Sequence, residues 1–210
     1  MNNQIILIGG GGHCKSCIDV IEAENKYKIV GIIDMKDKIG SKVLDYPVIG
    51  SDDDLAKLTK QYNNFFITVG QIKNFKTRTN IFNELKKIGV IFPIIVSPLA
   101  HVARTAQIGE GSIIMHNVLI NTDAVIGKNC IINNNSLIEH ESIIGDNVHI
   151  ATGSIVNGQC EVGANSFIGS RSVLANNVQI PSGTVIGAGS VVINSLLEPG
   201  TYVGNPARLI

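Results

Sequence analysis

The chain has 210 residues, with 17 basic and 17 acidic side chains and only 5% aromatic residues. This balanced charge gives no general attraction to nucleic acid or to an anionic membrane, and few rings are present on which single-stranded bases could stack. No apolar run is long enough to span a bilayer, and the first residues lack the basic segment and cleavage site of a signal peptide. We therefore expect a cytoplasmic protein that binds neither nucleic acid nor membrane.

An α/β unit is expected first. A buried strand over residues 5–8 runs into four glycines at 9–12, a helix follows over about 13–24, and a second strand ends at Asp34. In such a unit the glycines let the backbone approach a phosphate, while the helix N-terminus supplies N–H groups and a positive dipole. Asp34 is placed to accept hydrogen bonds from a ribose. The pattern favours a ligand with a phosphate and a sugar, and a tight turn without a ligand is the alternative.

The glycine loop departs from the dinucleotide-binding fingerprint. Gly10 and Gly12 match its first two glycines, but Lys15 stands where the third glycine is required. A nucleotide or nucleotide-sugar site is therefore favoured over a tight NAD site.

Further strands and helices complete this unit. Ser51 and the three aspartates after it predict the start of a helix that runs to about Gln61. A third strand ends at Gly70, a helix follows over about 74–88, and a fourth strand over 90–98 closes the unit. Helices between consecutive strands predict a parallel sheet, so residues 1–98 form a half-Rossmann, nucleotide-sugar-binding domain. Basic residues accompany the last helix, and Arg78 is the candidate phosphate contact among them: Lys73, Lys76, Arg78, Lys86 and Lys87.

Two cysteines, Cys14 and Cys17, stand on the first predicted helix with the spacing of a redox or metal pair. No second pair accompanies them to complete a zinc site. Packing is the favoured interpretation, and a redox or metal role is the alternative.

A six-residue repeat organises the chain from Val102 onward. Every sixth residue from there to Val192 is aliphatic, at sixteen successive positions, and the residue four places after each of the first fifteen is small or β-branched. Such a period is typical of a parallel β-helix, in which three hexads form one triangular coil. We expect the aliphatics and the small residues, Cys130 and Cys160 among them, to face inward.

The repeat also predicts bends and boundaries. Glycine or asparagine often follows the aliphatic residue, and we expect these positions to adopt positive φ at tight bends. They are Gly109, Asn121, Gly127, Asn133, Gly145, Asn157, Gly163, Gly169 and Gly187. The β-helix should cover residues 99–193, and residues 194–210 should form a C-terminal arm, because their prolines do not continue a strand ladder comfortably.

Ionisable residues are few on the outward positions of the repeat, with one exception. Residues 139–149 hold Glu139, His140, Glu141, Asp146 and His149. His140 should point outward near a corner with Glu141 beside it, and a carboxylate bonded to an imidazole can orient a general base. A solvated surface histidine is the alternative.

A metal site is a further alternative, because the repeat contains four histidines, His101, His116, His140 and His149. The nine residues between His140 and His149 are half a coil, which places the two side chains on different faces. We therefore expect no metal.

The whole chain resembles a known family. Its hexads and the ending "VGNPAR" resemble the left-handed β-helix acyltransferases. With "IGGGGH", Asp34, a strand that ends in "TVG" and the segment "NNSLIEHESIIGDNVHIATGSIVNG", the chain is similar to the sugar acetyltransferases of the PglD/NeuD type. The resemblance implies an α/β half-Rossmann domain followed by a left-handed β-helix acetyltransferase domain, acetyl-CoA as the co-substrate, and a role in bacterial surface glycan or glycoprotein biosynthesis.

The resemblance also implies roles for individual residues. It makes His140 the general base, Glu141 its orienting partner and the Gly158 N–H the oxyanion donor. The implied acetyl-CoA contacts are His149, Gly158, Ser170, Gly187 and Ala188. The implied acceptor contacts are Gly10, Gly12, His13, Asp34, Arg78 and Asn133.

Three functions follow as hypotheses. The first is N-acetylation of a UDP-4-amino-4,6-dideoxy-N-acetyl-sugar or a similar nucleotide-activated amino sugar, which the glycine loop and Asp34 favour. The second is O-acetylation of sialic acid, and the third is a non-catalytic scaffold that binds sugar or coenzyme A. Since one flank of a β-helix is too flat to enclose coenzyme A, we expect a cyclic homotrimer with three sites between subunits.

Overall fold

The computed structural model describes residues 3–72 and 74–210, and these form two compact units. The α/β unit extends to Gly70 and includes Lys76–Ile95, whereas the β-helix unit comprises Gln71–Phe75 and Val96–Ile210. The division at Val96 is close to the boundary predicted after residue 98. The short segment before the last helix of the α/β unit was not expected to pack with the β-helix. Lys73 in this segment lies outside the described residues.

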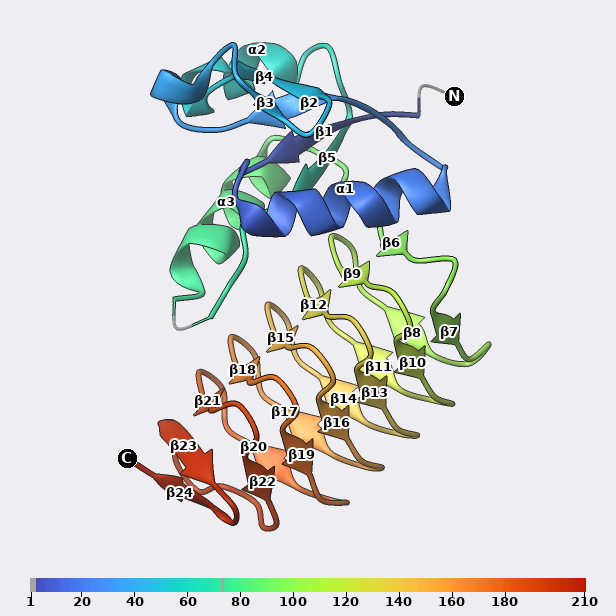
Figure 1. Ribbon diagram of the computed structural model, residues 1–210, viewed down its shortest axis with the longest axis vertical. Helices are drawn as coiled ribbons and strands as arrows, with labels where there is room; N and C mark the ends of the chain where they lie inside the picture. Colours follow the sequence, from blue (N-terminus) through green and yellow to red (C-terminus); the bar gives the residue numbers. More distant parts are fainter. Residues whose placement is uncertain (1–2, 73) are drawn as a thin grey trace. The chain divides into compact units, whose positions relative to one another are not determined.

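A five-stranded sheet forms the centre of the α/β unit (Figure 1), in the order β3-β4-β2-β1-β5. Its strands are β1 (Gln4–Ile8), β2 (Lys28–Ile33), β3 (Lys42–Val43), β4 (Tyr46–Gly50) and β5 (Asn64–Ile67). Its helices are α1 (Gly12–Glu24), α2 (Leu55–Leu58) and α3 (Lys76–Lys87), with 3-10 turns η1 (Lys36–Lys38) and η2 (Asp52–Asp54). Strands β4, β2, β1 and β5 are parallel, as predicted, and the edge strand β3 pairs antiparallel with β4.

The prediction of the α/β unit was correct for β1, α1, β2, β5 and α3. The hairpin of β3 and β4 was missed, and the helix predicted after Ser51 is shorter, although Ser51 and Asp54 do form a capping box. The predicted fourth strand over residues 90–98 was wrong. This segment makes one isolated bridge to Asn64, passes Pro93, which has no N–H to continue a ladder, and then joins a sheet of the β-helix unit.

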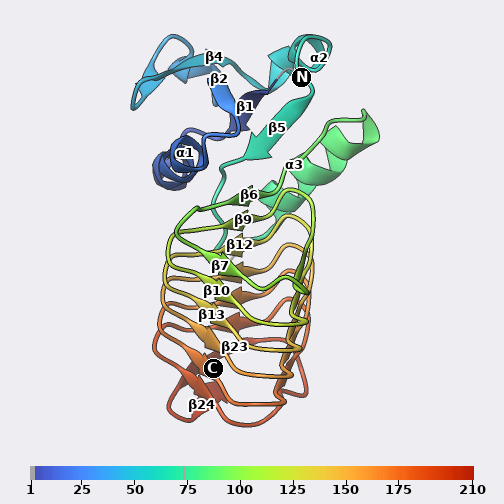
Figure 2. The ribbon, with the colours of Figure 1, turned by 90° about the vertical axis from the view of Figure 1, so that its right-hand side faces the viewer.

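Three sheets form the walls of the β-helix unit, with parallel strands except for β24 at the end of the third sheet, and Figure 2 shows their stacked coils. The first sheet contains β7 (His101–Val102), β10 (Leu119–Ile120), β13 (Leu137–Ile138), β16 (Ile155–Val156), β19 (Val173–Leu174) and β22 (Val191–Val192). The second contains β8 (Gln107–Ile108), β11 (Val125–Ile126), β14 (Ile143–Ile144), β17 (Glu161–Val162) and β20 (Gln179–Ile180). The third contains β6 (Ile95–Val96), β9 (Ile113–Ile114), β12 (Ile131–Ile132), β15 (His149–Ile150), β18 (Phe167–Ile168), β21 (Val185–Ile186), β23 (Thr201–Gly204) and β24 (Ala207–Leu209).

The fold of this unit is the predicted left-handed parallel β-helix. The repeat aliphatics from Ile114 to Val192 are at most 3% exposed, so each contributes about 1.5–3 kcal/mol by burial. The buried hydroxyls of serines at the small positions donate hydrogen bonds to backbone oxygens of the neighbouring coil. Ser142 Oγ donates to Asn157 O, and Ser154 Oγ donates to Gly169 O. Cys130 and Cys160 are buried in the same kind of position, as predicted.

The bends are made differently from the prediction. Positive φ occurs three residues after the aliphatic, as at Asn117, Glu141 and Gln159, and not at the residue directly after it. Glycine directly after the aliphatic serves close stacking of coils. A Cβ on Gly127, for example, would lie 2.7 Å from the backbone nitrogen of Asp146 in the next coil.

The C-terminal residues are part of the β-helix rather than a separate arm. β23 pairs parallel with β21 and antiparallel with β24, which closes the last coil. Pro199 and Pro206 stand outside these two strands, so the residues of β23 keep their N–H groups for pairing. Tyr202 and Ala207 are buried against the core by this hairpin.

Candidate active site

His140 and Glu141 lie in the turn between the first and second sheets, directly after β13. Glu141 adopts φ 59°, and its Oε2 is 3.1 Å from His140 Nδ1. Because a carboxylate can only accept, Nδ1 carries the proton of this bond and Nε2 keeps its lone pair. The His140 and Glu141 side chains are 48% and 54% exposed. An exposed imidazole with a free Nε2 lone pair can take a proton from a substrate.

Gly158 stands one coil further along, against the ring of His140. A Cβ on this glycine would lie 2.7 Å from His140 Nε2 and 2.8 Å from Cε1, so only glycine leaves room for the ring as it stands. No acceptor for the Gly158 N–H is found in residues 3–72 and 74–210. The turn thus combines a base with a nearby N–H donor.

Polar side chains that the sequence analysis did not predict as site residues surround this pair. Gln159 Nε2 donates to Glu141 Oε2 at 3.1 Å. Asn121 Nδ2 donates to Glu139 Oε2 at 2.7 Å, and the same oxygen accepts the His140 N–H at 3.3 Å. Gln159 and Asn121 are each 18 residues from their partner, so the period of one coil is the signal that could have identified them.

His149 is buried on β15, in the third sheet. Its Nδ1 donates to the backbone oxygen of Gln71, so Nε2 is an acceptor, and it lies 3.3 Å from Asn133 Nδ2. The ring of Phe167 packs edge-on at 5.1 Å between centroids. His149 and His140 therefore lie on different faces, as expected from their spacing.

Ser170, Gly187 and Ala188 lie at the corner between the third and first sheets, after β18 and β21. Ser170 and Ala188 are exposed, whereas the Gly187 N–H donates to Tyr202 O. Asn133 belongs to the same corner, after β12. One copy of the chain thus brings His140, Glu141 and Gly158 together at one edge of the first sheet. It places Ser170, Gly187 and Ala188 at the other edge.

In the α/β unit, the Asp34 carboxylate binds the glycine loop. Its Oδ2 accepts from the Gly10 N–H at 3.1 Å and from Lys38 Nζ at 3.0 Å, and its Oδ1 accepts from the Met35 N–H at 2.8 Å. Burial alone would raise the pKa of Asp34, but these donors together hold that pKa below its usual value. A Cβ on Gly10 would lie 2.5 Å from Asp34 Oδ2, so this glycine is required for the close approach.

The first two turns of α1 hold His13, Cys14 and Cys17. Cys17 Sγ lies 3.4 Å from His13 Nε2, and both cysteines are buried and free. Burial raises the pKa of both thiols, which disfavours the reactive thiolate. The arrangement agrees with packing as the role of the two cysteines.

The prediction that Arg78 contacts a phosphate was wrong. Its side chain is inside the unit, at 1% exposure, and its Nη1 donates to the backbone oxygens of Ile67 and Val69. A guanidinium held in this way stabilises the end of β5 and does not reach a phosphate on the surface. The sequence could not reveal this, because most arginines on a helix of mixed polarity are solvated.

A small pocket of about 190 Å³ opens at the carboxyl ends of β1, β2 and β5. Ligands of open α/β sheets bind at this end of the strands. Asp34 and Gly9 belong to its lining, which is Ile8, Gly9, Ile33, Asp34, Met35, Asp52, Val69, Thr77 and Ile81.

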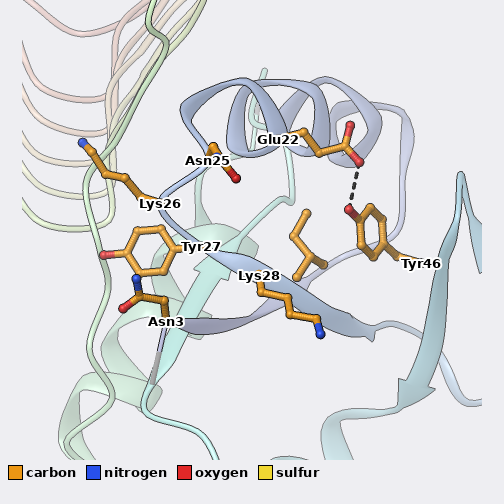
Figure 3. A pocket seen from close by; sticks show the side chains of 8 residues that line it. Asn3, Glu22, Asn25, Lys26, Tyr27, Lys28 and Tyr46 are labelled. Atoms are coloured by element: carbon orange, nitrogen blue, oxygen red, sulfur yellow. Dashed lines mark hydrogen bonds between the residues drawn. The ribbon is translucent and has the colours of Figure 1, made fainter. Parts of the chain in front are cut away.

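A larger pocket of about 570 Å³ lies at the opposite, amino ends of β1 and β2 (Figure 3). Glu22 accepts a hydrogen bond from Tyr46 there at 2.8 Å, and burial together with Glu22 raises the pKa of Tyr46 to about 12. None of the predicted site residues lines this pocket, whose residues are Asn3, Glu22, Asn25, Lys26, Tyr27, Lys28, Ile29 and Tyr46.

No cluster of three or more His, Cys, Asp or Glu side chains with metal-binding geometry occurs in residues 3–72 and 74–210. No helix within those residues has the length and apolarity to cross a membrane.

Two family descriptions match the chain. Residues 4–85 match the PglD N-terminal domain, and residues 96–207 match the GMPPB C-terminal domain. A comparison with curated proteins found no match.

Solved structures of similar proteins cover nearly the whole chain. The acetyltransferase domain of PglB from Neisseria gonorrhoeae is 28% identical, with a TM-score of 0.92 and all of both chains covered. PerB from Caulobacter crescentus, in complex with CoA and GDP-perosamine, is 30% identical, with a TM-score of 0.90 over 98% of this chain and 96% of that one. WeeI from Acinetobacter baumannii is 26% identical, with a TM-score of 0.86 over 98% and 99%.

Proposed function

Because the chain belongs to the PglD-type sugar acetyltransferases, we propose that it transfers an acetyl group from acetyl-CoA to the amine of a nucleotide-linked amino sugar. That the chain is an acetyltransferase with acetyl-CoA as its donor follows from its relatives, which include PglB with acetyl coenzyme A bound. The observation that carries the reaction type is the His140–Glu141 pair against Gly158. Among the reaction steps of bacterial glycan assembly, such an enzyme would acetylate the nucleotide-activated sugar before a later enzyme transfers that sugar to the glycan.

His140 acts as the general base in this proposal. Glu141 holds Nδ1–H, so Nε2 takes the proton from the sugar amine as its nitrogen attacks the thioester carbon. A C–N bond forms, the carbon–sulfur bond then breaks, and His140 returns the proton to the leaving thiolate of coenzyme A. The enzyme forms no covalent intermediate. PerB has been crystallised with its substrate after replacement of a single histidine, which is consistent with such a role for one histidine in that relative.

The Gly158 N–H stabilises the oxyanion of the tetrahedral intermediate. It is next to the base, and it has no acceptor in the described residues. A donor of this kind contributes about 10²–10³ to the rate.

The α/β unit holds the nucleotide end of the acceptor. The Gly12 end of α1 presents N–H groups to a phosphate, with His13 in the first turn, and the pocket beside Asp34 takes the nucleoside. Asp34 keeps Gly10 in place while it forms one wall of that pocket. Arg78 has no part in this site because of its buried position.

Acetyl-CoA binds in a groove between neighbouring copies of a homotrimer. The outward side chains of the first sheet form an apolar stripe between the two edges that carry the predicted residues: Leu119, Leu137, Ile155, Val173 and Val191. Packing of this stripe between copies brings His140 and Gly158 of one copy to the Ser170 corner of the next. His149 then contributes to the side of the groove that binds acetyl-CoA, and Asn133 lies near the acceptor sugar.

The trimer is tested by sedimentation. The wild-type chain should sediment at three times 22.4 kDa, and Ile155→Lys in the centre of the stripe should yield monomers without activity. Ile143→Lys, at an exposed isoleucine of the second sheet, is the matched control and should stay trimeric and active. A fully active wild-type monomer would contradict the proposal.

The reaction is tested with acetyl-CoA and a panel of UDP-, GDP- and CMP-linked amino sugars together with free sialic acid, by release of the coenzyme A thiol. We expect turnover with a nucleotide-linked 4-amino sugar. Turnover with sialic acid alone would indicate an O-acetyltransferase, and binding of acetyl-CoA without any transfer would indicate a scaffold.

A further inference from the structure

The carboxamide of Gln159 is bonded to the proposed base–carboxylate pair from the neighbouring coil. Its Nε2 donates to Glu141 Oε2 at 3.1 Å, and this is the same oxygen that faces His140 Nδ1. The Gln159 backbone N–H also donates to the backbone oxygen of His140 at 3.0 Å. One residue is thus bonded to both members of the pair.

The stacking of coils explains why this contact is available. Gln159 is 18 residues after Glu141, and both adopt positive φ, at 60° and 59°, so their side chains leave the corner in the same direction. Gly158 and Gln159 of one coil therefore support His140 and Glu141 of the other. The glycine makes room for the ring, and the glutamine holds the carboxylate.

Glu141 needs such a restraint because half of its side chain is exposed. A free glutamate in water samples many rotamers, and only a fraction of them place an oxygen beside Nδ1. Without that oxygen, the imidazole proton is free to move to Nε2, and the neutral ring then cannot accept a proton there.

We propose that Gln159 is a positioning residue of the acetyltransferase, which acts through Glu141 to keep His140 in the tautomer with its proton on Nδ1. The inference rests on the proposed role of His140. Within the described part of the chain, the carboxylates hydrogen-bonded to His140 are Glu141, at Nδ1, and Glu139, at the backbone N–H.

The test is a double-mutant cycle of Gln159→Ala and Glu141→Ala, assayed with acetyl-CoA and GDP-perosamine, or with the UDP-linked 4-amino sugar if that turns over faster. In the wild-type background, Gln159→Ala should lower kcat about fivefold and change either KM less than about twofold. In the Glu141→Ala background the same substitution should change kcat less than about twofold. Equal losses in both backgrounds would overturn the inference.

Alanine at positive φ strains the backbone, so a matched control is needed. Asn117→Ala places the same residue at φ 57° in another coil, away from the pair. It should lower the melting temperature as Gln159→Ala does and leave kcat unchanged. If Asn117→Ala lowered kcat to the same extent, the loss at Gln159 would be structural and the inference wrong.

Gln159→Glu supplies a readout that a structural role would not change. A second carboxylate near the imidazole favours its protonated form, so the acid limb of the kcat profile should move about half a pH unit or more to higher pH. The ¹⁵N shifts of the His140 ring should report Nδ1–H in the wild type and a tautomer mixture in Gln159→Ala. An unmoved limb with unchanged ring shifts would contradict the proposal. If His140→Ala retained turnover, the proposed function itself would fail, and the ring shifts would still test the contact.

Discussion

At the His140 corner of the β-helix unit, two side-chain contacts join residues one coil apart, Gln159 with Glu141 and Asn121 with Glu139, both at 18 residues. In the α/β unit the separations are irregular, with 24 residues between Gly10 and Asp34 and 11 between Arg78 and Ile67. A constant separation means that a contact can be located from the sequence once the period is known. An irregular separation depends on how strands and helices pack. The effect of a substitution in the α/β unit is therefore set by tertiary contacts.

The largest effect is expected at the corner of the β-helix. His140→Ala should lower kcat by about 10³, within the range for loss of a general base, with the fold unchanged. Thiol release measures the rate, and far-ultraviolet circular dichroism with thermal melting checks the fold. Near-normal turnover by a folded variant would contradict the proposed mechanism.

The next effect is expected in the α/β unit, at Arg78. Arg78→Met removes a buried donor from the carbonyls of Ile67 and Val69, and we expect the free energy of unfolding to fall by about 2–3 kcal/mol. Urea denaturation measures this change. A phosphate contact would instead give unchanged stability and a raised KM for the nucleotide sugar, and that result would contradict the structural role of Arg78.

Gly158 tests whether the close stacking of two coils holds the His140 ring in place. Gly158→Ala places a Cβ in the space of the His140 ring, so the ring must turn away. We expect kcat to fall about 10- to 100-fold with little change in KM, because the base is displaced while the binding surfaces remain. A crystal structure of the variant would show the displaced ring, and unchanged kcat would mean that the ring does not act from this position.

The smallest effect is expected at Asp34, and it depends on pH. The pKa of Asp34 is lowered in the folded chain, so its contribution is present above the unfolded value near 3.9 and is lost as pH falls through the folded value. Asp34→Asn should therefore reduce the free energy of unfolding by about 1 kcal/mol at pH 7, with the difference shrinking as pH falls below the unfolded value. Urea denaturation over a series of pH values tests this, and a difference that stays constant as pH falls would exclude the charge as its cause.

The β-helix could be predicted almost completely, because sixteen aliphatics in one phase leave no other fold that buries them. The same periodicity misled us about the bends. Glycine and asparagine after the aliphatic were assigned positive φ, whereas the positive φ lies two residues later, and the glycines are needed for close stacking. The repeat pattern shows that a small residue is required at this position. It does not show whether the reason is a positive φ or the lack of space for a Cβ between coils.

The sequence by itself determined the order of the two folds, the inward aliphatics and the unusual hexad that begins at Ile138. Each of these depends on local periodicity or on residue type. Only the tertiary structure decided that Arg78 is buried, that residues 201–209 close the β-helix and that the Asp34 carboxylate binds the glycine loop. Such facts depend on which backbone groups lie near one another after packing, and residues far apart in the chain supply them.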